Sequence, residues 1–200
     1  MDKFAIMEHY FSILEKTIKR DWDSPALANY KGESFTFQQV ATNIEKFHIF
    51  FRAAGIKRGD KIALSARNSA RWANTFLAIT TYGAVAVPIL CDFTPNAIAN
   101  LADHSESVML FTDAEIFAKM DAGKMPKVKA VINNNDYTLL RCASPEFEEA
   151  FRNLNPSFAD KYPMGFSREC VCYPKDNDKD ICVINYTSGT TSAPKGVMLR

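Results

Sequence analysis

Apolar residues recur at steps of three and four positions near the start of the chain. Residues at that spacing lie on one side of an α-helix, so the pattern predicts an amphipathic helix over residues 4 to 20. We expect its apolar side to pack on a core or on a partner. The stripe consists of Phe4, Met7, Phe11, Leu14 and Ile18.

A β-hairpin and a second helix are predicted next. The β-prone runs ALANY and SFTF flank the turn-like triplet KGE at residues 31 to 33. Thr36 and Gln39 have the spacing of a capping box, in which each residue caps the backbone of the other at a helix start. An apolar face follows, and Gly55 is expected to end this helix. That face consists of Val40, Ile44, Phe47, Phe51 and Ala54.

From residue 61 onward, short apolar strands alternate with helices. The strand runs are apolar on both faces, as a sheet covered by helices on both sides requires. This order predicts an α/β fold: a doubly wound, mostly parallel sheet flanked by helices. The predicted strands are residues 61–65, 84–89, 108–112 and 129–133, and the predicted helices are residues 70–82 closed by Gly83, a helix opened by Thr94-Pro95, residues 115–120, and a helix opened by Ser144-Pro145.

Residues 155 to 180 differ in composition from the part before them. They are rich in Pro, Asp, Lys and Asn and have few periodic apolar positions, which predicts a surface connection. The run DICVINYT, at residues 180 to 187, then predicts a buried strand that leads into a loop rich in Thr, Ser and Gly. The residues VMLR, at 197 to 200, are again β-prone.

Composition places the chain among ordinary globular proteins. Of its 200 residues, 47% are hydrophobic and 24% are charged, and the net charge is +1. No polyanionic partner such as a nucleic acid is therefore expected. No run approaches the roughly 18 apolar residues of a membrane span, and the first residues lack the apolar run of a signal peptide. We expect a cytoplasmic protein without a transmembrane segment.

The five cysteines form an odd set without a secretion signal, so we expect reduced thiols. The closely spaced pair Cys170 and Cys172 raises the question of a metal site. The other cysteines and the histidines lack the spacing of zinc ligands, so no metal site is expected. The cysteines are Cys91, Cys142, Cys170, Cys172 and Cys182, and the histidines are His9, His48 and His104.

Asp103, His104 and Glu106 have the residue types of an acid–base cluster. The alternative is the solvated end of a helix, where charged side chains are common, and we favour this interpretation.

The loop TSGTTSAPK, at residues 187 to 195, combines hydroxyl groups, successive backbone N–H groups and one lysine. Gly189 lets the backbone bend closely around a ligand, and such a concavity suits phosphate oxygens. Lys195 adds a positive charge, and hydrogen bonds to charged groups are worth roughly 1.5–3 kcal/mol each. A triphosphate site is one interpretation, and a polar hairpin loop without a ligand is the other.

The loop does not have the Walker A pattern. That pattern places a lysine directly after its second glycine, at the start of a helix. Here Lys195 precedes Gly196, Pro194 precedes the lysine, and the residues that follow are β-prone. Residue order and predicted context both exclude the Walker interpretation.

The segment YTSGTTSAPKGVML resembles the phosphate-binding signature of the adenylate-forming (AMP-binding) superfamily, which includes acyl-CoA synthetases. Ser192 is the position that departs, since the family usually has glycine there. The runs GESFTFQQVATNIEKFHIFFRAAGIKRGDKIAL and WANTFLAITTYGAVAVPI resemble the family's early helix and first strand and its helix–glycine–strand segment. Within the superfamily, the chain looks most like a long-chain fatty acid–CoA ligase.

The resemblance implies a two-step reaction. A fatty acid carboxylate attacks the α-phosphorus of Mg²⁺-bound ATP and releases pyrophosphate, and coenzyme A then displaces AMP from the acyl-adenylate. Both first reactants are anions, so the site must neutralise and orient them. The resemblance assigns the β- and γ-phosphates of ATP, and the pyrophosphate that leaves, to Thr187, Ser188, Gly189, Thr190, Thr191 and Lys195.

The resemblance also implies that residues 1–200 are the N-terminal part of an AMP-binding domain that ends just after the phosphate loop. The family's adenine and acyl pockets, its metal ligand and its catalytic lysine all lie further along the chain. We therefore expect no catalytic residue and no metal ligand here, no turnover by this part alone, and homo-oligomers through exposed apolar surface. The alternatives are an adenylation domain for another carboxylate and a non-catalytic binding or assembly module with a vestigial loop.

Overall fold

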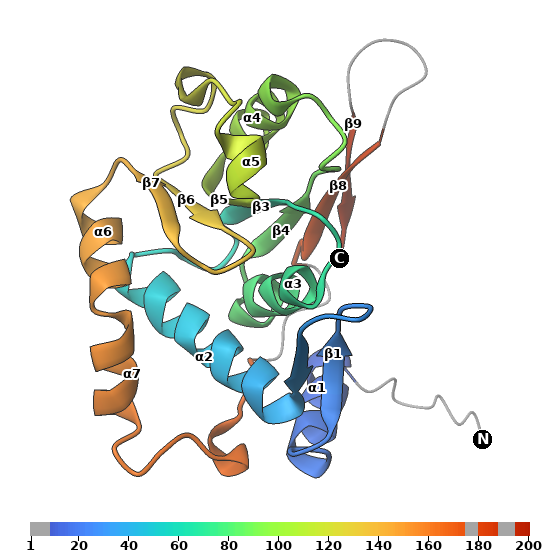
Figure 1. Cartoon of the computed structure of the whole chain (residues 1–200), viewed down its shortest axis with the longest axis vertical. Coiled ribbons are helices and arrows are strands. Elements are labelled where there is room, and N and C mark those ends of the chain that lie inside the picture. Colours follow the sequence, from blue (N-terminus) through green and yellow to red (C-terminus); the bar gives the residue numbers. More distant parts are fainter. Residues whose placement is uncertain (1–8, 175–179, 188–194) are drawn as a thin grey trace.

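The computed structural model describes residues 9–174, 180–187 and 195–200. Figure 1 shows a central sheet, a layer of long helices beside it, and a small hairpin near α1. The central sheet has seven strands in the order β7-β6-β5-β3-β4-β8-β9. Strands β3 to β6 and β8 pair in parallel, whereas β7 and β9 pair antiparallel at the two edges. The strands are β3 (Lys61–Ser65), β4 (Val85–Pro88), β5 (Ser107–Thr112), β6 (Ala130–Asn133), β7 (Leu139–Cys142), β8 (Val183–Thr187) and β9 (Lys195–Leu199).

Helices cover the two faces of this sheet, and each face has its own apolar core. The larger core contains side chains of α2 and α3 together with Ile62 of β3 and Phe111 of β5. The smaller core contains side chains of α4 together with Ala63 of β3 and Leu110 of β5. Because the crossovers through α3 and α4 lie on opposite faces, the predicted doubly wound α/β fold is confirmed. The helices are α1 (Tyr10–Arg20), α2 (Phe37–Ala53), α3 (Ala70–Tyr82), α4 (Pro95–His104), α5 (Ala114–Phe117), α6 (Pro145–Arg152), α7 (Leu154–Lys161), and the 3-10 turns η1 (Ala122–Lys124) and η2 (Arg168–Cys170).

The predicted hairpin and helix caps are present. Strands β1 (Pro25–Ala28) and β2 (Ser34–Thr36) pair antiparallel. The capping box is formed, since Thr36 N donates to Gln39 Oε1 at 2.8 Å and Gln39 N donates to Thr36 Oγ1 at 3.3 Å. Gly83 ends α3 in the left-handed conformation, with φ of 87°, which a residue with a side chain rarely adopts.

The first helix is shorter in the described residues than the sequence predicts. It begins at Tyr10 with His9 as its N-cap, and Phe11 and Ile18 of the predicted stripe are buried. Phe4 and Met7 lie outside the described residues. Within the part of the chain that is described, no helix is both long and apolar enough to cross a membrane.

Residues 155 to 180 are more than the predicted surface connection. Helix α7 contains residues 155 to 161, and Val171 and Tyr173 are buried in the larger core at 2% and 7% exposure. The sequence hid this helix because its apolar residues are few and Pro156 lies in its first turn, where proline is tolerated. Strand β7 was also not predicted, because Leu139–Cys142 is a short edge strand without alternation of polar and apolar residues.

Candidate functional site

The strands β8 and β9 form a hairpin that frames the predicted phosphate loop. Thr187 pairs with Lys195 as the last register pair before the loop, so the structure places the backbones of these two predicted site residues side by side. Lys195 is exposed. The other predicted phosphate ligands lie outside the described residues: Ser188, Gly189, Thr190 and Thr191, together with the divergent Ser192.

The loop follows the carboxyl end of a parallel strand. β8 pairs in parallel with β4, so the carboxyl ends of both strands lie at the same edge of the sheet. In open α/β sheets, ligands bind outside the carboxyl ends of the strands. The location of Thr187 and Lys195 is therefore suited to ligand binding, and the exposed ammonium of Lys195 is free to approach an anion in solution.

Gly196 has a packing role beside the loop. It lies opposite Tyr186 in the hairpin, and a Cβ atom at this position would come within 3.2 Å of Ile184 Cγ2 and 3.4 Å of Tyr186 Cε1. The distance to Ile184 is tighter than ordinary van der Waals contact and the distance to the ring is at its lower limit, so a side chain here would press on both residues. The glycine after Lys195 thus leaves space for Tyr186 to lie against the hairpin.

Tyr186 is the buried residue of the hairpin next to the loop. It is 5% exposed, and burial raises the pKa of its phenol above the ordinary value, so the phenol is neutral at physiological pH. Its hydroxyl lies 2.8 Å from His104 Nδ1, at the end of α4. The sequence analysis missed this contact, because no pattern in the chain links two residues 82 positions apart.

The residues near His104 do not form the acid–base cluster considered above. Glu106 lies near two lysines, with distances of 3.5 Å to Lys61 Nζ and 3.8 Å to Lys127 Nζ. Asp103 Oδ1 accepts from the backbone of Lys127 at 3.4 Å. Asp103 and Glu106 both contact Lys127, whereas His104 contacts Tyr186, so no acid–base pair forms within the trio. This agrees with the exposed helix end that we favoured.

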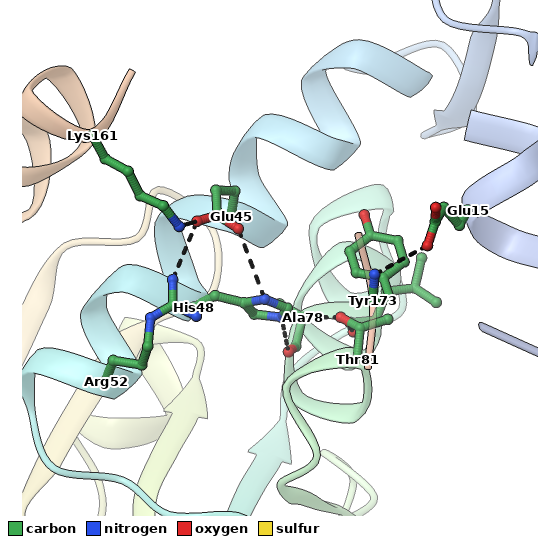
Figure 2. Close-up of polar contacts among 9 residues, drawn as sticks. Glu15, Glu45, His48, Arg52, Ala78, Thr81, Lys161 and Tyr173 are labelled. Atoms are coloured by element: carbon green, nitrogen blue, oxygen red, sulfur yellow. Dashed lines mark hydrogen bonds and ion pairs between the residues drawn. The ribbon is translucent and has the colours of Figure 1, made fainter. Parts of the chain in front are cut away.

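A second group of polar side chains lies between α2, α3 and α7 (Figure 2). Glu45 is its centre, with Oε1 at 2.6 Å from Lys161 Nζ and 3.2 Å from Arg52 Nη2. On the other side, Glu45 Oε2 lies 4.0 Å from His48 Nδ1. The group joins the unpredicted helix α7 to α2.

His48 is buried at 3% exposure and is held from two sides. Its Nε2 lies 3.1 Å from the Ala78 carbonyl oxygen and 3.1 Å from Thr81 Oγ1. Because a carbonyl can only accept, Nε2 carries the proton and Nδ1 is free of one. Burial lowers the pKa of the imidazole from 6.5 to about 4, so the ring is neutral. A buried neutral ring with its N–H engaged acts in packing and leaves no room for a substrate.

Tyr173 covers the other side of the His48 ring. The two ring centroids are 6.2 Å apart in an edge arrangement, and Tyr173 N donates to Glu15 Oε2 at 3.1 Å. Figure 2 shows Tyr173 between the His48 side and Glu15 of α1. This contact links the end of the described segment before residue 175 to the first helix, which supports a structural role for the whole group.

No metal centre is apparent in the described residues. Within them, no group of three or more His, Cys, Asp or Glu side chains is placed to hold a metal ion. The five cysteines are unpaired, and Cys170 and Cys172 are exposed.

Comparison with known proteins finds relatives among proteins named as CoA ligases and acyl-CoA synthetases. The 4-hydroxybutyrate–CoA ligase 2 of Metallosphaera sedula is 26% identical over 185 residues, which are 92% of this chain and 33% of that protein. Long chain acyl-CoA synthetase 5 of Arabidopsis thaliana is 26% identical over 172 residues, which are 82% of this chain and 24% of that protein. The chain therefore spans a third or less of the length of these relatives.

Solved structures support the fold. The anthranilate CoA ligase AuaEII, in complex with anthranoyl-AMP, matches 96% of this chain and 34% of its own chain with a TM-score of 0.74. The identity is 22%, so this likeness bears on the fold alone. The profile of AMP-binding enzymes matches residues 14–200, which is nearly the whole chain, and the chain therefore belongs to the AMP-binding enzyme family.

Proposed function

We propose that this chain is the N-terminal part of an ATP-dependent acid–thiol ligase that makes acyl-CoA thioesters. The observation that carries the proposal is the register pair of Thr187 and Lys195 at the mouth of a Thr/Ser/Gly-rich loop, in a chain of the AMP-binding family. Relatives named as CoA ligases and acyl-CoA synthetases support the thiol acceptor.

The proposed reaction has two steps. A carboxylate oxygen attacks the α-phosphorus of ATP, the bond to the bridging oxygen breaks, and pyrophosphate leaves with that electron pair. The thiol of coenzyme A then attacks the carbonyl carbon of the acyl-adenylate, and AMP leaves as the thiol proton is lost. Both steps bring anions together, so the protein's contribution is charge neutralisation and orientation.

In this proposal, the loop of residues 187 to 195 holds the β- and γ-phosphates. The exposed Lys195 fits that role, since its ammonium can reach an anion without losing another buried partner. Thr187, Ser188, Gly189, Thr190 and Thr191 would donate hydroxyl and backbone hydrogen bonds. Mg²⁺ would arrive bound to the phosphates of ATP, and the resemblance places the family's protein ligand for the ion further along the chain.

We further propose a long-chain fatty acid as the carboxylate substrate. A relative named as a long chain acyl-CoA synthetase supports it. Relatives named for 4-hydroxybutyrate and anthranilate favour the alternative of another carboxylate. Comparison of kcat/KM for palmitate, 4-hydroxybutyrate and anthranilate in the whole protein decides between them, and a preference for either small acid would reject the fatty acid.

Lys195→Ala tests the role of the loop in the whole protein. Loss of a charged hydrogen bond to phosphate should lower kcat/KM for ATP–pyrophosphate exchange by about 10- to 100-fold. Arg200→Ala, an exposed cation just after β9, is the matched control and should change the rate by less than about twofold. An unchanged exchange rate in Lys195→Ala would reject the assignment.

The serine at position 192 favours the second candidate function, a non-catalytic binding or assembly module with a vestigial loop. Serine has a narrower backbone range than the glycine usual in the family, so the loop could have lost its ability to close on phosphates. Calorimetric titration of ATP into the whole protein separates the two functions. Saturable heat supports the ligase, and its absence together with no pyrophosphate exchange supports the module.

A further inference from the structure

Within the described residues, the hairpin that carries the loop has its register pair with the rest of the sheet at the start of β8. The register of β8 with β4 consists of one pair, Ala86 with Val183. Ala86 N also donates to the Cys182 carbonyl oxygen at 2.9 Å, just before β8 begins. These contacts hold the start of β8, whereas the loop begins at its other end.

In the described part of the chain, β8 also contacts the body through the side chains of Val183, Ile184 and Tyr186, and Val183 packs on the larger core. Ile184 and Tyr186 pack on the smaller core. The hydroxyl of Tyr186 lies 2.8 Å from His104 Nδ1, and the two rings meet nearly edge to face with centroids 5.9 Å apart. Tyr186 immediately precedes Thr187, so this bond lies one residue from the mouth of the loop.

His104 lies on a part of the body that is firmly packed. Leu101 and Ala102, in the same turn of α4, are buried at 6% and 0% exposure. Just after the helix, Ser105 Oγ donates to the Ala102 carbonyl oxygen at 2.9 Å and lies 2.7 Å from Ser107 Oγ at the start of β5. The backbone at the end of α4 is therefore held by the core, and the exposed His104 side chain extends from it to the Tyr186 hydroxyl.

Tyr186 belongs to β8 and also contacts β9, so its position affects both strands of the hairpin. Its ring lies beside Gly196 of β9, where a Cβ atom would come within 3.4 Å of Tyr186 Cε1. Gly196 is adjacent to Lys195, and Tyr186 is adjacent to Thr187. Holding the Tyr186 hydroxyl therefore fixes the residues on both sides of the loop.

We propose that His104 is a positioning residue for the phosphate-binding loop, and that it acts through the Tyr186 hydroxyl. The bond from α4 fixes the outer end of the β8–β9 hairpin, so that Thr187 and Lys195 are oriented before ATP binds. This proposal rests on the ATP-dependent function proposed above. Binding residues that are oriented in advance lose less freedom when the ligand binds, which improves binding without changing the chemical step.

The test uses His104→Ala, Tyr186→Phe and the double variant in the whole protein. Each single change removes one partner of the bond, so we expect KM for ATP to rise about three- to tenfold with kcat within about twofold. The double variant should be no worse than either single variant, because both remove the same interaction. His104→Asn, which retains a polar amide close to the place of Nδ1, should restore most of the affinity.

Hydrogen exchange provides a readout that does not depend on ATP. Amides of residues 184 to 199 should exchange faster in His104→Ala than in the unaltered protein. Asn100→Ala, at an exposed position one turn earlier on α4, is the matched control and should change neither exchange nor KM. The proposal is overturned if His104→Ala leaves the exchange of the hairpin unchanged, or if the effects of the two single variants on KM simply add.

The two proposals fail in different ways. If the unaltered protein neither binds nor uses ATP, the ligase function fails, whereas faster exchange in His104→Ala would still support the contact as the anchor of the hairpin. If ATP is used but the hairpin exchanges at the same rate in all variants, the ligase function stands and the role of His104 is rejected.

Discussion

The interior strands of the sheet and the β8–β9 hairpin differ in how deeply their side chains are buried and in the chemistry that we assign to them. All four residues of β6 are buried, as are most residues of β3 to β5, whereas all five residues of β9 are exposed. The interior strands lie between two layers of helices, while the hairpin extends from one edge (Figure 1). The region with the most packing carries no predicted chemistry, and the region with the proposed chemistry has the least packing. Stability and ligand binding are thus assigned to separate parts of the chain.

The difference has a physical cause. Apolar burial stabilises a fold but leaves no polar group accessible to a ligand. Phosphate binding requires exposed N–H groups, hydroxyls and a cation, none of which can lie in a core without a partner. A hairpin at the edge of the sheet meets that requirement, and its position is then fixed by a small number of directional contacts such as the one between Tyr186 and His104.

The largest expected effect contrasts a core side chain with an exposed one. Phe111→Ala removes a ring that is fully buried and meets the Phe47 ring edge to face at 5.3 Å, so the free energy of unfolding should fall by about 3–5 kcal/mol. Val197→Ala in β9, at 46% exposure, should change it by only about 0.5 kcal/mol. Urea denaturation of both variants checks this. Equal losses would contradict the division between a stabilising interior and an exposed hairpin.

Acid should lower the free energy of unfolding by about 3 kcal/mol through the titration of His48. The folded pKa of His48 is about 4, against 6.5 for an ordinary histidine, so the unfolded chain binds a proton more readily. The contribution of His48 is complete above pH 6.5 and is lost as the pH falls toward 4, at about 1.4 kcal/mol per pH unit over that interval.

The pH effect is isolated by comparing the unaltered protein with His48→Gln. Glutamine can donate to the Ala78 carbonyl oxygen as the imidazole does, but it does not titrate. The variant should be less stable at pH 7 because its side chain fills the site less well, yet it should lose less stability between pH 6.5 and 4. Parallel pH profiles of unfolding free energy in the two proteins would show that His48 is not the acid-sensitive group.

Replacement of Gly196 should have a small effect on stability and a larger effect on the use of ATP. In Gly196→Ala, the new methyl group would lie 3.2 Å from Ile184 Cγ2 and 3.4 Å from Tyr186 Cε1, and a shift of a few tenths of an ångström would relieve the contact. We expect unfolding free energy to fall by less than about 1 kcal/mol, while KM for ATP rises several-fold because the ring and the loop are displaced. Val197→Ala is the neighbouring control and should leave KM unchanged. A large loss of stability with unchanged KM would assign the glycine to folding alone.

Much of the fold followed from local patterns. The capping box of Thr36 and Gln39 and the glycine end at Gly83 were predicted because each acts within a few residues along the chain. The parallel strands followed from apolar runs separated by helices. Helix α7 and strand β7 were missed because their sequences carry weak periodicity, and both are stabilised by contacts with elements already in place.

The proposed site was only partly accessible from sequence. The motif indicated the loop and Lys195, and its resemblance to a known signature indicated the family, which the comparison with AMP-binding enzymes establishes. The contact of His104 had no signal in the sequence, where the residue reads as part of an exposed helix end. Only the three-dimensional arrangement shows that its ring reaches a buried tyrosine.

The sequence by itself determined the alternation of strands and helices, the covered sheet and the position of the Thr/Ser/Gly-rich loop after a strand. Tertiary structure alone decided which distant side chains meet, such as Tyr173 with Glu15, 158 residues apart, and Tyr186 with His104. The reason is physical. Periodicity specifies which face of an element is apolar, but the partner of a polar side chain depends on which elements pack together and in what register.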